Sequence, residues 1–105
     1  MINNIIGYDL NTFLEKRGVT LSDYGSSESG LSRPDAILFL DLIYKAGKSP
    51  LGIEIWRHRG SKYFIDSLAG WYSESDDPEI NSKSVRAFIS TLDISKDDVM
   101  TIQFH

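Results

Sequence analysis

The sequence predicts an α+β fold: a small antiparallel sheet built on one β-hairpin, completed by a C-terminal strand and packed by two or three helices. Apolar and polar residues alternate from Leu51 to Ile55, Gly60 marks a reversal, and a β-rich run follows. Helical apolar spacing occurs both before and after this hairpin. At 105 residues, the chain is expected to form a single domain spanning 1–105.

The composition is ordinary for a globular protein, with 41% hydrophobic and 25% charged residues. There is no cysteine, so neither a disulfide framework nor a cysteine-ligated metal can form. No apolar run approaches the roughly 20 residues that span a bilayer. The first residues, Met1 to Ile6, lack the basic start and long apolar middle of a secretory signal. We therefore expect a cytoplasmic protein that does not associate with membranes.

The formal net charge is −4, and the acids are unevenly distributed. From Tyr63 to Ser82 there is no Lys or Arg but there are five acids, namely Asp66, Glu74, Asp76, Asp77 and Glu79. Basic side chains gather instead at Arg57, Arg59 and Lys62, around the presumed hairpin tip. A negative field disfavours nucleic-acid binding and attracts a basic partner. A solvated acidic loop without a partner would give the same pattern.

Two of the expected helices are identified by apolar spacing. The first covers 7–17, where Leu10, Phe13 and Leu14 share a face, and a loop covers 22–30. The last covers about 82–92, and its apolar stripe consists of Val85, Phe88, Ile89 and Leu92. The acidic stretch before it, to about Asn81, is expected to be a loop.

The second helix has the clearest boundaries. Ser32 can cap it, Pro34 lies in its first turn, and Asp35 would complete a short capping box. Its body is apolar nearly all round and must be buried on more than one side. Asp41 is expected to lie on its one exposed stripe, since unpaired buried carboxylates are rare. Gly47 ends the helix.

The hairpin register follows from matching apolar residues across the strands. With 59–61 as the loop, Ile55 pairs with Ile65, whereas a one-residue shift would place Ile55 opposite Asp66. The first register leaves one sheet face with Glu54, Trp56, His58, Phe64 and Asp66. Two aromatic residues on that face predict that the chain itself covers it, with a partner as the alternative. A last strand over 99–104 follows the third helix, and a parallel arrangement would require a right-handed crossover.

No motif indicates catalysis or a cofactor. The glycines Gly25 and Gly30 are one residue too far apart for a nucleophile elbow, and no phosphate-binding loop is present. His58 and Glu54, on one strand face, are the only candidate acid/base pair, with no nucleophile beside them. The cluster of Asp76, Asp77 and Glu79 lacks calcium-loop spacing, so a solvated loop is favoured over a metal site. We expect a protein that is not an enzyme.

The alternative to catalysis is recognition through the acidic, aromatic stretch after the hairpin. Trp71 is expected to anchor this stretch inside, leaving Tyr72 and Glu74 outside. The candidate partner-binding residues are Glu54, Trp56, Tyr72, Glu74, Asp76, Asp77 and Glu79. A second hypothesis is a small-molecule or enzymatic pocket near Trp56, His58 and Trp71. A third is an adaptor subunit of a larger assembly.

Five short motifs follow one another from about Gly25 to the C-terminus. They are Gly30 in a loop, Ser32 to Ala36 at the start of an apolar helix, Pro50-Leu51-Gly52 before a strand, Trp71 and Glu74 after the hairpin, and Ser84, Ala87, Phe88 and Ile89 in a late helix. In this order they resemble the immunity protein 40 family of bacterial polymorphic-toxin systems. The chain departs from that pattern after Gly52, where Ile53 and Glu54 replace a glycine and an aspartate.

The resemblance implies a non-catalytic inhibitor that is made beside a toxin and binds the toxic domain tightly in the cytoplasm. The expected partner is therefore a cognate toxin domain. An acidic inhibitor would suit a basic nuclease toxin, because charge complementarity speeds association and helps to select the partner.

Overall fold

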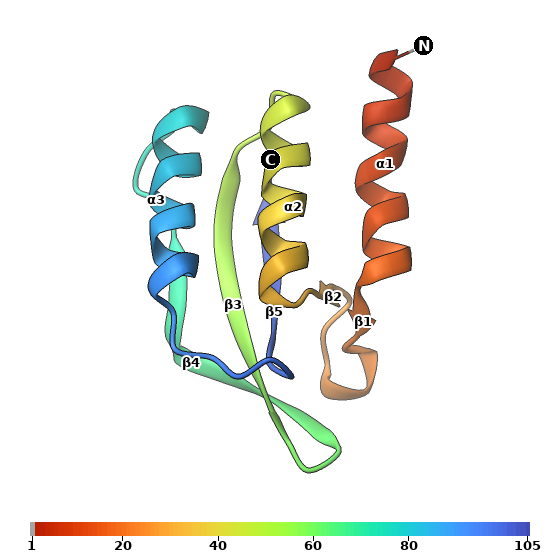
Figure 1. Ribbon diagram of the computed structural model, residues 1–105, viewed down its shortest axis with the longest axis vertical. Coiled ribbons are helices and arrows are strands. Elements are labelled where there is room, and N and C mark those ends of the chain that lie inside the picture. The colour runs from red at the N-terminus through yellow and green to blue at the C-terminus, as the bar shows by residue number, and fades with distance from the viewer. Residues whose placement is uncertain (1) are drawn as a thin grey trace.

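The computed structural model describes the backbone of residues 2–105 and the side chains of residues 10–105. One layer of helices covers one face of a three-stranded sheet, which confirms the α+β prediction (Figure 1). The helices are α1 (Ile2–Arg17), α2 (Arg33–Lys45) and α3 (Pro78–Thr91), with a 3-10 turn, η1 (Ser22–Tyr24). The strands are β1 (Val19–Thr20), β2 (Ser29–Gly30), β3 (Pro50–Arg59), β4 (Lys62–Tyr72) and β5 (Val99–Phe104).

The main sheet has the order β4-β3-β5 and is antiparallel throughout, while β1 and β2 form a separate two-stranded sheet. Because β4 and β5 both run antiparallel to β3, they are parallel to each other. Figure 1 shows the chain rising along β4, descending in front through α3 and rising again in β5 on the right. This connection is right-handed, as expected for a crossover between parallel strands.

The core lies between the helix layer and the sheet. Its fully buried members include Phe39 and Ile43 of α2, Val85 and Ile89 of α3, Ile53 and Ile55 of β3, and Met100 of β5. Each such side chain contributes about 1.5–3 kcal/mol by burial. The helix α2 lies between α1 and α3 and rests on the sheet, so its nearly continuous apolar surface is buried on several sides, as predicted (Figure 1).

The last helix begins one turn earlier than predicted. It starts at Pro78 rather than near residue 82, and the side chain of Asp77 caps it by accepting a hydrogen bond from the backbone N–H of Glu79 at 2.9 Å. Proline in the first turn and acids near a helix N-terminus are both favourable. Two of the acids that were assigned to a loop therefore belong to a helix start.

Two further local predictions need correction. The helix α1 begins at Ile2 rather than at residue 7. Ser32 occupies the N-cap position of α2, but its side chain makes no capping hydrogen bond, so the capping box is wrong. Asp35 instead forms an ion pair with Arg17 at 3.0 Å, because α1 packs beside α2. The prediction for Asp41 is confirmed: its side chain is half-exposed and pairs with Arg86.

The predicted hairpin register is wrong by one residue. The loop contains only Gly60 and Ser61, and Ile55 lies opposite Asp66. Gly60 has a φ of 63°, as a type II′ turn requires at its first loop position. Matching apolar residues across the two strands gave the wrong register because Asp66, although it lies opposite Ile55, has a charged partner. Its carboxylate accepts a hydrogen bond from Arg57 Nε at 3.1 Å.

The shift in register is absorbed by a large bulge in β4. Between the pairs Ile55–Asp66 and Ile53–Trp71, residues 67–70 of β4 face a single residue of β3. Leu68 in this bulge is 96% exposed. Bulges of this kind twist a strand and disturb the edge of a sheet.

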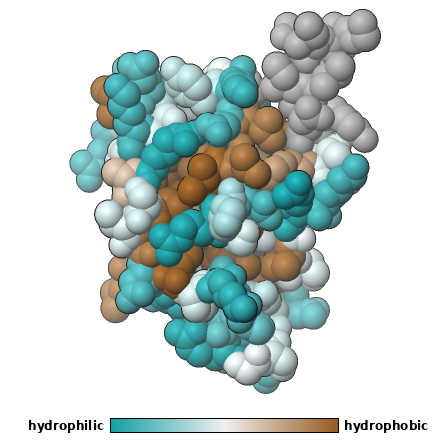
Figure 2. Space-filling view, viewed as in Figure 1, coloured by the Kyte–Doolittle hydropathy of each residue, from teal (hydrophilic) through white to brown (hydrophobic). Residues whose placement is uncertain are grey.

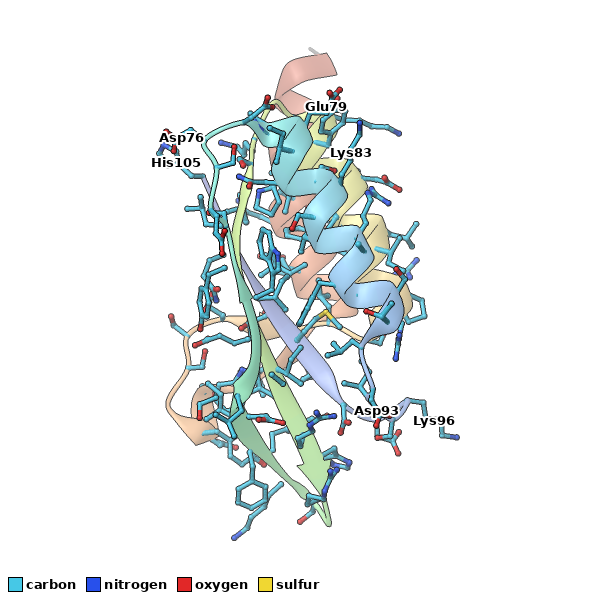
Figure 3. All side chains as sticks on the ribbon, turned by 90° about the vertical axis from the view of Figure 1, so that its left-hand side faces the viewer. Asp76, Glu79, Lys83, Asp93, Lys96 and His105 are labelled. Atoms are coloured by element: carbon cyan, nitrogen blue, oxygen red, sulfur yellow. The ribbon has the colours of Figure 1, made fainter. Side chains whose placement is uncertain are left out.

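The sheet face away from the helices, called the outer face below, is only partly covered. The segment 19–30 folds beneath its lower half, where Leu21 and Val99 pack on Trp56 (Figure 3). The upper half carries no covering element of the described chain in Figure 3. Because of the register shift, Phe64 and Asp66 belong to the helix side and not to the outer face as predicted.

Candidate functional site

Each arginine of the chain is engaged within the fold. Arg17 pairs with Asp35, Arg57 with Asp66 and Asp98, Arg59 with Asp98, Arg86 with Asp41, and Arg33 donates to the backbone carbonyls of Ile89 and Leu92. The arginine side chains thus join different elements of the structure. The acids that remain without such a partner can define the field at the surface.

Asp98 is the most buried of the paired acids, with 1% of its side chain exposed. It accepts hydrogen bonds from the backbone N–H of His58 at 2.8 Å and of Ser95 at 3.0 Å, and it faces Arg57 at 3.4 Å. Burial alone would raise the pKa of Asp98, but these hydrogen bonds outweigh burial and hold the pKa below its usual value. Asp98 therefore ties the start of β5 to the end of β3.

A second group of acids lies at the opposite end of the molecule and is called the acidic rim. It consists of Glu74, Asp76, Asp77 and Glu79. All four are exposed, and none forms an ion pair with any residue whose side chain is described. Figure 3 places Asp76 and Glu79 at the end of the fold far from Asp93 and Lys96. The rim therefore places four unpaired carboxylates at the N-terminus of α3.

A groove of about 520 Å³ runs beside the rim, between the end of β4 and α3. Its lining includes Trp71, Tyr72, Glu74 and Ile80. Trp71 faces the helix layer, is partly buried and donates its Nε1–H to Ser84 Oγ at 3.0 Å. Tyr72 is 64% exposed. The predicted placement of Trp71 inside and of Tyr72 and Glu74 outside is confirmed.

Glu54 lies on the open half of the outer face, within a polar cluster. Thr101 Oγ1 donates to Glu54 Oε1 at 3.3 Å, and Gln103 Nε2 lies 3.5 Å from the same oxygen. Gln103 Nε2 also donates to Glu28 Oε2 at 2.8 Å. Tyr72 joins this cluster because it pairs with Gly52, which also lies opposite Gln103. Thr101 is fully buried, and we call the four accessible side chains (Glu28, Glu54, Tyr72 and Gln103) the open sheet face.

Glu28 and Gln103 were not singled out from the sequence. The alternation along β5 places Gln103 on the same face as Val99, which is the signal that could have indicated its position. Nothing in the Ser-rich segment 22–30 indicates that Glu28 folds back onto that face. The two residues meet only because the segment 19–30 crosses beneath β5.

Trp56 does not belong to the surface, which corrects its assignment as a partner-binding residue. Its side chain is 6% exposed and packs with Leu21 and Val99. Its Nε1–H is buried without a hydrogen-bond partner. The segment 19–30 thus covers the outer face at Trp56, as predicted. A partner cannot reach Trp56 while this segment stays in place.

The hypothetical pocket near Trp56, His58 and Trp71 is not formed. Trp71 lies on the helix side of the sheet, whereas Trp56 and His58 lie on the outer face. The His58 ring packs against Tyr63, with centroids 4.7 Å apart. Glu54 is four residues from His58 along one strand, or roughly 13 Å, so the two cannot share a proton directly.

No group of three or more potential metal ligands converges among the described side chains. The helix side differs from the outer face in character. Figure 2 shows apolar surface in the middle of that side. The exposed large side chains of α2 are Leu38 and Tyr44. Within the described part of the chain, no helix combines the length and apolar content needed to cross a bilayer.

Comparison of the chain with protein-family models, curated proteins and solved structures found no match. The geometry of the acidic rim, the groove and the open sheet face is therefore the basis for a functional proposal.

Proposed function

We propose that this protein is a non-catalytic binding protein that neutralises a bacterial toxin domain with a basic surface, in the manner of an immunity protein of the cytoplasm. One observation carries the proposal. The four carboxylates of the acidic rim form no ion pair with described residues, whereas each arginine contacts a carboxylate or a backbone carbonyl elsewhere in the fold. Four unpaired carboxylates therefore lie together at one end of the molecule.

Such an arrangement suits rapid capture of a basic protein. Complementary charge raises association rates by roughly 10- to 1,000-fold, and salt screens the effect over a Debye length of about 8 Å at physiological ionic strength. Exposed Tyr72 in the groove beside the rim supplies the aromatic contact that interface hot spots favour. The rim would steer the partner, and the groove would hold it.

The separation of the candidate acid and base supports a binding role over a catalytic one. His58 packs against Tyr63, and Glu54 is engaged by Thr101 and Gln103. General acid–base catalysis requires such groups within hydrogen-bond reach of one reacting atom. An interaction surface requires only exposure, shape and charge, which the rim and the groove provide.

The test is growth protection by co-expression with the C-terminal domain of a toxin encoded beside this gene. The triple variant Glu74→Gln/Asp76→Asn/Glu79→Gln removes rim charge but keeps Asp77, which caps α3. We expect protection by the native protein and at least a ten-fold loss of affinity in the variant, measured by calorimetry on the purified pair.

The control is an equally neutralised set of exposed acids elsewhere, Glu15→Gln/Asp23→Asn/Asp97→Asn. It should protect cells as well as the native protein does. If the two triple variants behave alike while both remain folded by circular dichroism, the acidic rim is not the binding surface. If the native protein neither binds nor protects against the neighbouring toxin domain, the proposed function is wrong.

A further inference from the structure

Tyr72 forms a flat aromatic platform on the outer face. A Cβ placed at Gly52 would lie 3.1 Å from Tyr72 Cδ1 and 3.3 Å from Cε1. A Cβ at Gly70 would lie 3.4 Å from Cε2 and 3.5 Å from the hydroxyl oxygen. One edge of the ring therefore rests on Gly52 and the other on Gly70, so the ring lies along the backbone. Since Tyr72 is 64% exposed, its other side is open to solvent.

Gln103 connects two carboxylates to this platform. Gln103 Oε1 would be 2.8 Å from a Cβ at Gly52, so Gln103 leans over the same glycine as Tyr72 does. The Nε2 of Gln103 reaches Glu28 at 2.8 Å and Glu54 at 3.5 Å. A neutral amide thus holds the two carboxylates near each other. Neither carboxylate forms an ion pair with a described residue.

We propose that the open sheet face seats an arginine side chain of the protein partner, stacked on Tyr72 and paired with Glu28 and Glu54. This inference rests on the proposed function, because it names the contact that a basic partner would make. A guanidinium is planar and presents several N–H donors in a fixed fork, so it can stack on an aromatic ring while it bonds carboxylates. A lysine ammonium offers the charge without the plane.

No arginine whose side chain is described fills this position. The arginines are engaged at the helix layer and at the hairpin tip, and the segment 19–30 covers the lower half of the outer face only. Gln103 supplies the hydrogen bonds that a cation would replace. An arriving guanidinium would replace this neutral donor with a cationic one, so that both partners of each hydrogen bond would be charged.

The probe is the peptide acetyl-Gly-Arg-Gly-amide, titrated into the ¹⁵N-labelled protein and followed by NMR. We expect chemical-shift changes concentrated at residues 28, 52, 54, 72 and 103. The Glu28→Gln/Glu54→Gln variant should bind at least about ten-fold more weakly, because both charge-assisted bonds are lost. The matched variant Glu15→Gln/Asp23→Asn has the same net charge and should bind as the native protein does.

Two further comparisons test the chemistry. The peptide with citrulline in place of arginine keeps the shape without the charge, and it should cause no saturable change. Gly52→Ala introduces a methyl group against the Tyr72 ring and should weaken binding several-fold, provided that the thermal melt shows a folded protein. Equal responses to arginine and citrulline, shift changes confined to the acidic rim, or unchanged affinity in the Glu28→Gln/Glu54→Gln variant would each overturn the inference.

These outcomes are separable from those of the proposed function. If the arginine peptide fails to bind while the neighbouring toxin domain is still bound and neutralised, the arginine site is wrong and the proposed function stands. If the peptide binds at the open sheet face but no toxin domain is neutralised, the site stands as a guanidinium site and the proposed function falls.

Discussion

Replacement of Asp98 by alanine should lower the free energy of unfolding by about 3 kcal/mol. The carboxylate is 1% exposed and accepts the N–H groups of His58 at 2.8 Å and Ser95 at 3.0 Å. Its removal leaves two backbone donors without partners, at about 1–3 kcal/mol each. Arg57 keeps Asp66, which limits the electrostatic part of the loss. In a domain of this size, about 3 kcal/mol corresponds to a fall in Tm of roughly 12–20 °C.

The pH dependence of this effect has a definite sign. Burial alone would raise the pKa of Asp98, but the His58 and Ser95 amides and Arg57 together lower it. The folded protein therefore holds the proton less tightly than the unfolded chain, whose Asp pKa is about 3.9. The contribution of Asp98 is fully present above that value, and it declines as pH falls through the folded-state pKa. The difference in free energy of unfolding between the native protein and Asp98→Ala should become smaller as the pH falls from 6 to 3.

Urea unfolding at a series of pH values, followed by circular dichroism, measures both quantities. Asp97→Ala is the matched control, since its exposed neighbouring carboxylate should contribute within about 0.5 kcal/mol. A loss below about 1 kcal/mol for Asp98→Ala at neutral pH, well under the sum for two orphaned amides, would show that Asp98 does not satisfy these two backbone N–H groups. A difference in free energy of unfolding that stays the same between pH 6 and pH 3 would contradict the lowered pKa of Asp98.

Three further predictions test separate parts of the fold. Trp71→Ala should destabilise the protein by about 2–4 kcal/mol in thermal melts, because it empties the space below α3, whereas Tyr72→Ala should leave Tm nearly unchanged. Equal shifts of Tm in the two variants would contradict their different placement. Arg33→Met should lower the free energy of unfolding in urea by about 1–3 kcal/mol, since the carbonyls of Ile89 and Leu92 lose a charged donor. An unchanged free energy of unfolding would contradict this role of Arg33. Trp56→Phe should lower the free energy of unfolding by less than about 1.5 kcal/mol, because the lost indole N–H has no partner. Trp56→Ala should lower it by about 3–5 kcal/mol. Comparable losses in the two variants would argue against an unsatisfied indole.

The elements of this fold could be predicted because each depends on local patterning. Alternation from Leu51 to Ile55 and the apolar stripe of α3 survive into the structure as β3 and as the buried Val85 and Ile89. The register could not be predicted in the same way. Matching apolar residues ignores Arg57, which satisfies Asp66 across the hairpin and turns an apparent mismatch into an ion pair.

The candidate site was predictable where its members are neighbours in sequence. Tyr72 and Glu74 line one groove because they are close together in the chain, beside a helix start. Glu28 and Gln103, by contrast, are 75 residues apart and meet only after β5 joins β3 and the segment 19–30 folds back. The same packing of the segment 19–30 on the sheet buries Trp56. It therefore removes one predicted contact residue, Trp56, and supplies Glu28, which was not predicted.

The central claim is that unpaired acids at one end of the molecule capture a basic protein. Its most direct test is the association rate constant for the neighbouring toxin domain, measured by stopped flow from 20 to 500 mM salt. We expect the association rate constant of the native protein to fall steeply as salt is added. The variant Glu74→Gln/Asp76→Asn/Glu79→Gln should associate more slowly, and its rate constant should respond less to salt. A native rate constant that does not respond to salt, or one that the triple substitution leaves unchanged, would contradict the claim.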